Sequence, residues 1–152
     1  MENQSFDPTF ASSAKALVLI GTLDVVARIL VAVLFFYSGV GKLLDPGAVV
    51  SRLSAVGFPL PAVATGLCIA VELGASIALV FGFRVVAVCA LLAGLTLLTA
   101  ILFHQFWAVE GAQKIGQTVH FLKNCAILGG LWFVARSALV RPAPGFAAGT
   151  GQ

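Results

Sequence analysis

Four apolar stretches, each long enough to cross a lipid bilayer, constrain this chain more than any other feature. They cover residues 17–44, 60–82, 85–106 and 117–139. A spanning helix needs about 20 apolar residues, and lipid admits only helices or closed barrels because backbone polar groups must be paired internally. Of the 152 residues, 60% are hydrophobic and 10% charged, unlike soluble domains. We therefore predict an all-α fold, an integral membrane four-helix bundle.

Turn signals separate the four stretches. Asp45 followed by Pro46 ends the first stretch and suits the start of another helix, which Gly57 would end. We expect this short interfacial helix over residues 46–56, between the first and second spanning helices. The connection at 82–84 is so short that helices two and three must be antiparallel neighbours.

The two ends of the chain differ in composition from the apolar stretches. Residues 1–16 are polar and mixed, and residues 140–152 are rich in Pro and Gly. This favours flexible tails around one transmembrane domain at 17–139. The nine Lys and Arg residues are scattered, so no nucleic-acid site is indicated. Their slight excess on the side that carries both termini favours cytoplasmic termini.

Charged residues inside a spanning segment are costly, so they face the bundle interior and have a partner or a function. We count ~1.5 Å per residue from the membrane face that carries the 45–60 connection. Arg28 and Glu72 then lie at a similar depth in the bilayer. We expect these two side chains to form one buried pair. Asp24, one turn before Arg28, is a competing partner. We interpret Asp24, Arg28 and Glu72 as structural buried charges, with a proton-handling role as the alternative.

A second group of polar residues lies at a shallower depth, nearer the membrane face that carries the 45–60 connection. Lys42 ends helix one, His104 ends helix three, and three polar residues share one side of helix four. For Lys42 in particular, and less for Lys123, the alternative is extension of the ammonium to the lipid headgroups. The candidate ligand-binding residues are Lys42, Glu72, His104, His120, Lys123 and Asn124.

Such a set of donors suits an amphiphilic ring with carbonyl oxygens. A quinone is the expected ligand, because His, Lys and Asn would bind its oxygens while its tail lies between helices. A haem between His104 and His120 is an alternative. It is disfavoured because a histidine at the end of a helix is more often an interfacial hydrogen bonder. The three cysteines lack zinc or dithiol spacing, and we predict no metal.

Small residues recur every fourth position in the second stretch, at Gly66, Ala70, Gly74 and Ala78. This spacing lets another helix approach the backbone closely. We expect that helix to belong to the same chain, and pairing with a second copy is the alternative.

Several motifs together resemble the DoxX family of small four-helix membrane proteins over residues 23–139. They are FFYSGVGKLLDP at 35–46, GFPLP at 57–61, VELGASIALVFGFR at 71–84 and FLKNCAILGGLW at 121–132, with Arg28 and His104. The resemblance implies a bacterial inner-membrane protein associated with membrane redox systems. The residues that carry the family pattern are Arg28, Lys42, Glu72, Lys123 and Asn124.

Two functions agree with these features. The first is a membrane subunit of a quinone-linked redox complex that binds a quinone, or a similar lipid-soluble carrier, in a polar cleft. No motif for a flavin, an iron–sulfur cluster or copper is present, so a partner subunit is expected to supply electrons. The second is a non-catalytic accessory subunit that docks onto a larger assembly, such as a respiratory or photosynthetic complex. Passage of protons or small solutes past Glu72 is a weaker third hypothesis.

Overall fold

A computed structural model describes residues 8–140, and the secondary structure of this part is entirely helical. The elements are α1 (Pro8–Leu44), α2 (Pro46–Ala55), α3 (Pro61–Phe81), α4 (Val85–Phe103), the 3-10 helix η1 (Phe106–Ala108) and α5 (Gly111–Val140). Four of them, α1, α3, α4 and α5, are long and apolar enough to cross a membrane. The prediction of an all-α protein with four spanning helices and a short helix between the first two is confirmed.

The helices run past the apolar stretches. α1 begins at Pro8, so residues 8–16, expected in the N-terminal tail, are helical. Proline is tolerated in the first turn and the Ala residues that follow favour helix, whereas the prediction considered polarity alone. α5 begins at Gly111, before the apolar stretch, and ends at Val140. The rest of both expected tails lies outside the described residues.

α2 forms the corner between α1 and α3. The side chain of Asp45, its N-cap, accepts a hydrogen bond from the backbone N–H of Ala48 at 3.1 Å. Pro46 occupies the first helical turn, where no backbone N–H is needed. Gly57, with a φ of +69°, follows the helix. The Asp-Pro and Gly signals therefore predicted both ends of α2 correctly.

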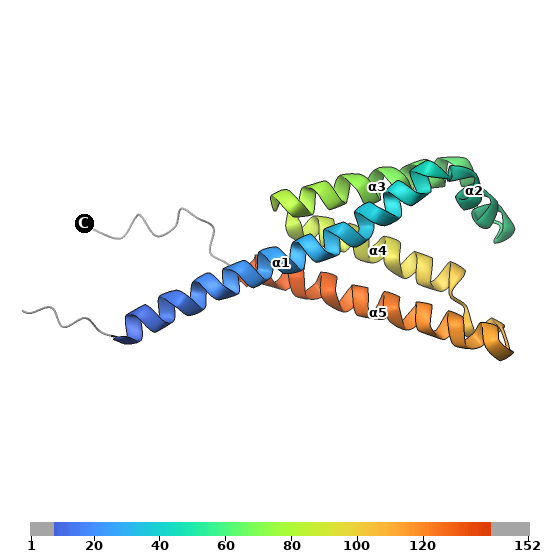
Figure 1. The fold of residues 1–152 in the computed structure, drawn as a ribbon. Helices are drawn as coiled ribbons and strands as arrows, with labels where there is room; N and C mark the ends of the chain where they lie inside the picture. The colour runs from blue at the N-terminus through green and yellow to red at the C-terminus, as the bar shows by residue number, and fades with distance from the viewer. Residues whose placement is uncertain (1–7, 141–152) are drawn as a thin grey trace, which may run out of the picture.

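Gly82 reverses the chain between α3 and α4. Its φ of +71° lies in the left-handed region that favours glycine. The N–H of Phe83 donates to the carbonyl of Ala78 at 2.8 Å, which satisfies one of the free carbonyls at the end of α3. The two helices are antiparallel neighbours, as predicted from the short connection (Figure 1).

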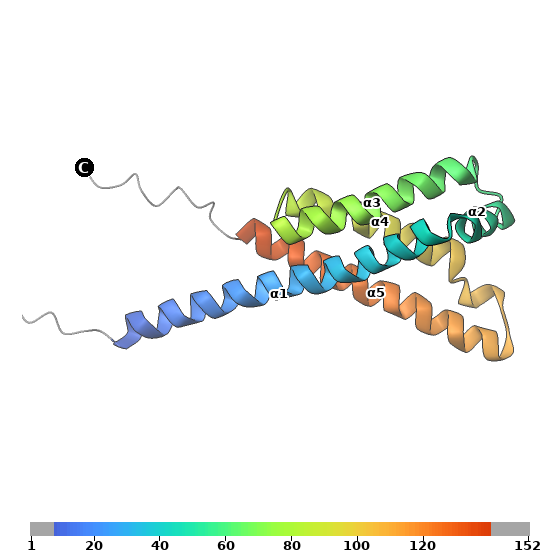
Figure 2. The same ribbon diagram turned by 45° about the horizontal axis from the view of Figure 1, so that its top comes forward.

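The spanning helices form two pairs. α1 packs mainly against α3, and α4 packs mainly against α5. Toward the end that carries α2 and η1, the two pairs diverge (Figure 1 and Figure 2). The hydrophobic core joins all four helices in the other half, near the Gly82 turn. Its members are Ala32, Phe35, Ala75, Leu79, Val85, Cys89, Leu92, Leu131 and Val134.

The small-residue stripe of α3 does not pack within the described chain, and that prediction was wrong. Gly66, Ala70 and Gly74 are exposed, and Ala78 is only half-buried. A Cβ added at Gly66 or Gly74 would meet no atom within 4 Å. The four-residue spacing identified residues that share a face, but it did not indicate whether that face points inward.

A close contact between α1 and α3 occurs instead at Gly39 of α1. A Cβ at this position would lie 2.9 Å from Leu73 Cδ2 and 3.1 Å from the Cβ of Glu72. Because such distances are below ordinary van der Waals contact, a glycine is required for α1 to approach α3 this closely.

Candidate functional site

An ion pair between Lys42 of α1 and Glu72 of α3 is the centre of the polar site. Lys42 Nζ donates to both carboxylate oxygens of Glu72, each at 2.8 Å. The Glu72 side chain is 6% exposed and that of Lys42 is 26% exposed, so the pair lies at the edge of the helix interface. The bidentate contact neutralises two charges at a place where an unpaired charge would be costly.

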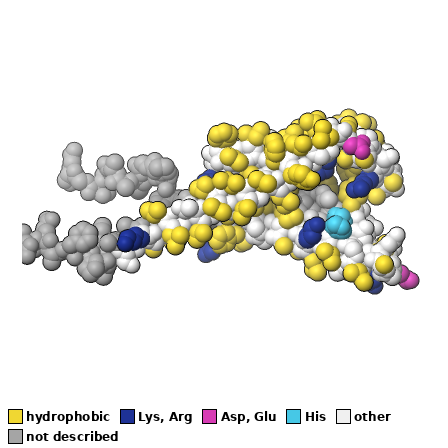
Figure 3. All heavy atoms as spheres, viewed as in Figure 1, with side chains coloured by type: hydrophobic (Ala, Val, Ile, Leu, Met, Phe, Trp, Pro, Cys, Tyr) yellow, Lys and Arg dark blue, Asp and Glu magenta, His cyan; other side chains and the backbone are white. Residues whose placement is uncertain are grey.

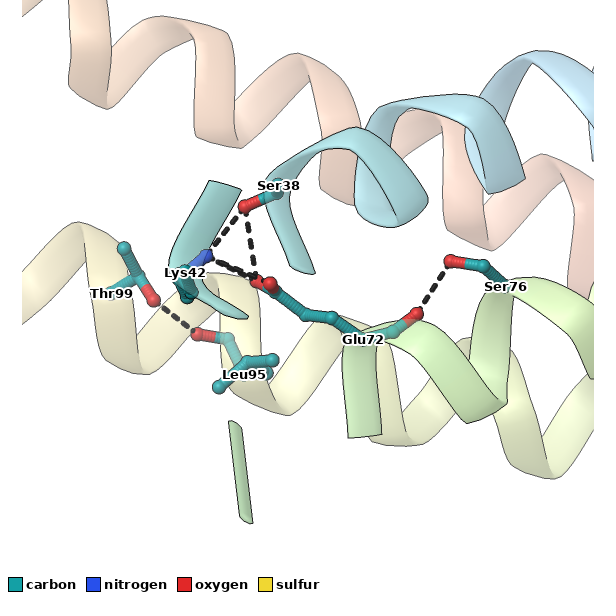
Figure 4. Close-up of polar contacts among 6 residues, drawn as sticks. All are labelled: Ser38, Lys42, Glu72, Ser76, Leu95 and Thr99. Carbon is teal, nitrogen blue, oxygen red and sulfur yellow. Dashed lines mark hydrogen bonds and ion pairs between the residues drawn. The ribbon is translucent and has the colours of Figure 1, made fainter. Parts of the chain in front are cut away.

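Ser38 completes this cluster. Its hydroxyl accepts a hydrogen bond from Lys42 Nζ and donates one to Glu72 Oε1 at 3.3 Å (Figure 4). Each of the three donor hydrogens of the ammonium therefore has an acceptor. Ser76 donates instead to the backbone carbonyl of Glu72. Ser38 was not among the predicted site residues, although its position one turn before Lys42 is a usable signal.

Glu72 does not pair with Arg28, which corrects the predicted ion pair. The depth comparison assumed that α1 ends and α3 begins at the same level. The contact between Gly39 and Glu72 shows that the last turns of α1 lie beside the middle of α3. α3 therefore extends further toward α2 by about six residues, or ~9 Å. As a result Lys42, rather than Arg28, lies opposite Glu72.

Arg28 lies at the other end of α3. A Cβ added to Gly82 would be 2.5 Å from Arg28 Nη1, so the guanidinium lies beside the carbonyl end of α3, where the helix dipole favours a cation. Its Nε is buried and has no hydrogen-bond partner in the described part of the chain. Asp24 is buried and lines a cavity of about 200 Å³ together with Arg136. Asp24 and Arg28 thus lie apart from the Lys42–Glu72 cluster.

His104 and His120 stack on each other where α4 meets α5. Their ring centroids are 5.0 Å apart and the planes are inclined by 17°. His104 Nδ1 also lies 3.0 Å from Oε1 of Gln117, which was not among the predicted site residues. Haem ligands bind iron from opposite sides of the porphyrin, whereas these rings lie directly against each other. The pair holds the end of α4 to the first turns of α5.

Aromatic rings support this end of α5. Phe106 and Trp107 of η1 contact Phe121 edge to face, with centroid distances of 5.3 Å and 5.9 Å. Such contacts add to the burial of the rings. They fix the α4–α5 connection beside the stacked histidines.

His120, Lys123 and Asn124 lie on the face of α5 that is buried further along the helix. At three- and four-residue spacing this face continues into Leu131 and Val134, each 1% exposed. Where the helix pairs diverge, the same face is open. His120 and Lys123 are exposed and Asn124 is half-buried. Lys123 and Asn124 have no hydrogen-bond or ion-pair partner in the described part of the chain.

Of the two lysines, Lys42 was the one expected to extend away from the bundle, but Lys123 is the more exposed. Lys42, for which extension to the headgroups was the stronger alternative, turns toward Glu72. Lys123 remains exposed. Figure 3 shows basic (Lys or Arg) and His side chains, with an acidic side chain nearby, around a hollow between the diverging pairs. We call this hollow the notch; the α1–α3 pair, which carries the Ser38–Lys42–Glu72 cluster, lies on one side of it, and the α4–α5 pair, which carries the polar face of α5, lies on the other.

Cys68 lies one turn before Glu72 on α3 and is half-buried. All three cysteines are free thiols. Within residues 8–140, no group of three or more His, Cys, Asp or Glu side chains is arranged to hold a metal ion.

Fold and site together define a small membrane protein with four spanning helices, an internal ion pair and an open polar face between two helix pairs. The chain belongs to the DoxX family, whose family model matches residues 23–105. It is 38% identical over 113 residues to the inner membrane protein YqjF of Escherichia coli K12, covering 72% of this chain and 79% of that protein. It is 29% identical over 113 residues to the inner membrane protein YphA of the same organism, covering 74% and 81%. No solved structure matches the chain.

The family resemblance is therefore confirmed. The relatives carry the name of inner membrane proteins, and this chain is an integral membrane protein by the length and apolarity of its helices. The orientation of the termini stays a prediction.

Proposed function

We propose that this protein binds a quinone, or a similar lipid-soluble carrier with a carbonyl-bearing ring, in the notch, as a membrane subunit of a redox complex. The observation that carries the proposal is the open polar face of α5. His120, Lys123 and Asn124 continue a buried helix face, yet no helix within residues 8–140 covers them. Polar groups on an inward face of a membrane bundle need water or a ligand.

The side chains of the notch match the head of such a carrier. The ammonium of Lys123 and the amide of Asn124 are hydrogen-bond donors for ring carbonyl oxygens. On the other side of the notch, Lys42 neutralises Glu72 through two hydrogen bonds of 2.8 Å. The carboxylate therefore does not repel the electron-rich oxygens of the ring. The carrier's tail would leave the notch between the two diverging helix pairs, toward the lipid.

The proposed role is to hold the ring and not to supply electrons. Reduction of a quinone takes electrons and protons in equal number, and the electrons would come from a partner subunit. His120, which is exposed, is the side chain suited to exchange a proton with the ring oxygen, because an imidazole nitrogen can donate or accept one.

Tryptophan fluorescence tests the proposal. The chain has two Trp residues, and Trp132→Phe leaves Trp107, near the notch, as the single reporter. A short-chain ubiquinone analogue titrated into the purified protein in lipid nanodiscs should quench Trp107 saturably. Lys123→Met should weaken binding about tenfold, because one hydrogen bond from a charged donor is lost.

Lys114→Met is the matched control. Lys114 is an exposed lysine in the first turns of α5, on the opposite side of the helix from Lys123, so its loss should leave binding unchanged. The proposed carrier site is contradicted if both variants and the parent protein give identical titrations, or if the quenching never saturates.

The second candidate, an accessory subunit that docks onto a larger assembly, is favoured by a different observation. Gly66, Ala70 and Gly74 form an exposed small-residue face on α3, which suits close packing of a helix from another chain. Gly74→Ile should then shift the protein to a smaller species in native gels of its membranes, with Trp107 quenching unchanged. An unchanged migration of the variant contradicts this candidate.

A further inference from the structure

A polar groove of about 350 Å³ lies at the corner between α1 and α2. Ser38, Gly41 and Lys42 line it from α1, and one face of α2 between Asp45 and Arg52 lines it from the other side. The groove shares two residues with the ion-pair cluster but extends along α2, which contacts α1 and α3 and does not contact α5. It is therefore distinct from the polar face of α5 on which the carrier proposal depends.

The α2 wall carries opposite charges at its two ends. Asp45, Ala48, Val49 and Arg52 are spaced by three and four residues and so share one face of the helix. Asp45, at the corner, uses Oδ1 to accept from the Ala48 N–H, which leaves Oδ2 available. Arg52 lies about 10 Å further along the helix axis. It is exposed and has no partner among the described residues.

Lys42 adds no net charge to the groove. Its Nζ is bonded to both oxygens of Glu72 and to Ser38, so all its donors are used. The groups left to bind a ligand are one carboxylate at the inner end and one guanidinium at the outer end. Such a pair complements a zwitterion, with an ammonium group and an anionic group a few bonds apart, better than it complements an anion.

We propose that this groove binds the headgroup of a phosphatidylethanolamine-type phospholipid. The lipid ammonium binds Asp45 and the phosphate binds Arg52, whose planar guanidinium suits phosphate oxygens. α2 connects two spanning helices at one face of the bundle, so phospholipid headgroups surround it. A primary ammonium donates hydrogen bonds to Asp45, whereas the quaternary ammonium of phosphatidylcholine has none to donate, and phosphatidylglycerol has no cation.

Native mass spectrometry of the full-length protein, titrated in detergent with these three lipids carrying identical acyl chains, tests the proposal. The wild type should bind phosphatidylethanolamine about tenfold more tightly than the other two. Asp45→Asn retains a good N-cap for α2 but removes the charge, so the preference should disappear. Arg52→Gln should weaken the binding of all three lipids by about tenfold, because each lipid carries a phosphate.

Lys114→Gln is the control, since it removes an exposed cation remote from the groove and should change none of the affinities. Circular dichroism checks that each variant is folded. Equal binding of the three lipids by the wild type, or a preference that survives Asp45→Asn, overturns the proposal. This test is independent of the carrier site, whose readout depends on Lys123 and Trp107 and not on Asp45 or Arg52.

Discussion

Lys42 Nζ lies 2.8 Å from each carboxylate oxygen of Glu72, and this contact sets the alignment of α1 along α3. The close approach of Gly39 to the Glu72 Cβ specifies the same alignment. A displacement of α1 by one turn would separate the two charges inside the bundle and leave each without its partner, which is strongly unfavourable.

Removing one member of the pair should destabilise the fold. Glu72→Leu leaves the Lys42 ammonium unpaired, and we expect a loss of about 2 kcal/mol, below the usual range for fully buried pairs because Lys42 is partly exposed. The double variant Lys42→Met with Glu72→Leu should regain most of this loss. Thermal unfolding in detergent, followed by circular dichroism, measures both. A single variant as stable as the wild type would show that the pair does not stabilise the bundle.

Gly39→Ala should weaken the contact between α1 and α3. The added methyl group would lie 3.1 Å from the Cβ of Glu72, a backbone-anchored atom that cannot move away easily, and we expect a cost of about 2 kcal/mol. Gly41→Ala is the matched control, because no atom lies within 4 Å of a Cβ there. That control should be neutral or slightly stabilising by helix propensity. Equal effects of the two substitutions in thermal unfolding would contradict the close approach.

Gly82→Ala should be more harmful than Gly57→Ala. Both glycines have positive φ, +71° and +69°, so each substitution carries a backbone cost of about 1 kcal/mol. Only at Gly82 would the new Cβ meet Arg28 Nη1, at 2.5 Å, which should raise the loss to about 2 kcal/mol by displacing a partly buried side chain. Chemical unfolding of the two variants under identical conditions compares them. The contact between Arg28 and the end of α3 is refuted if both lose the same stability.

Loss of the histidine stack should loosen the connection between α4 and α5. His104→Ala removes both the ring contact with His120 and the hydrogen bond to Gln117, so amide hydrogen exchange should accelerate in residues 104–110. His104→Phe keeps an aromatic ring for stacking and should have a smaller effect. If exchange in this segment is the same in all three proteins, the aromatic contacts of η1 hold the connection without the histidines.

The helices were predictable because their signals are local. Apolar length identified the four spanning segments, and Asp45-Pro46 and Gly57 identified α2. The chain reversal at Gly82 followed from the shortness of the connection. Each of these features depends on residues within a few positions of one another, so no knowledge of the packing was needed.

The polar contacts were less predictable, because they depend on how far one helix is displaced along another. Counting residues from the helix ends gave Arg28 and Glu72 the same depth in the bundle. In the structure α1 is displaced along α3, so that Lys42 and not Arg28 lies opposite Glu72. The direction of the α3 small-residue stripe likewise depends on which side of α3 receives α1. The spacing of His120, Lys123 and Asn124 correctly indicated one shared face, while their exposure depends on the divergence of the helix pairs.

Because the α1–α3 and α4–α5 pairs spread apart toward α2 (Figure 2), the molecule has a tapered profile. It displaces more lipid area in one leaflet than in the other. The polar face of α5 lies in this wider half.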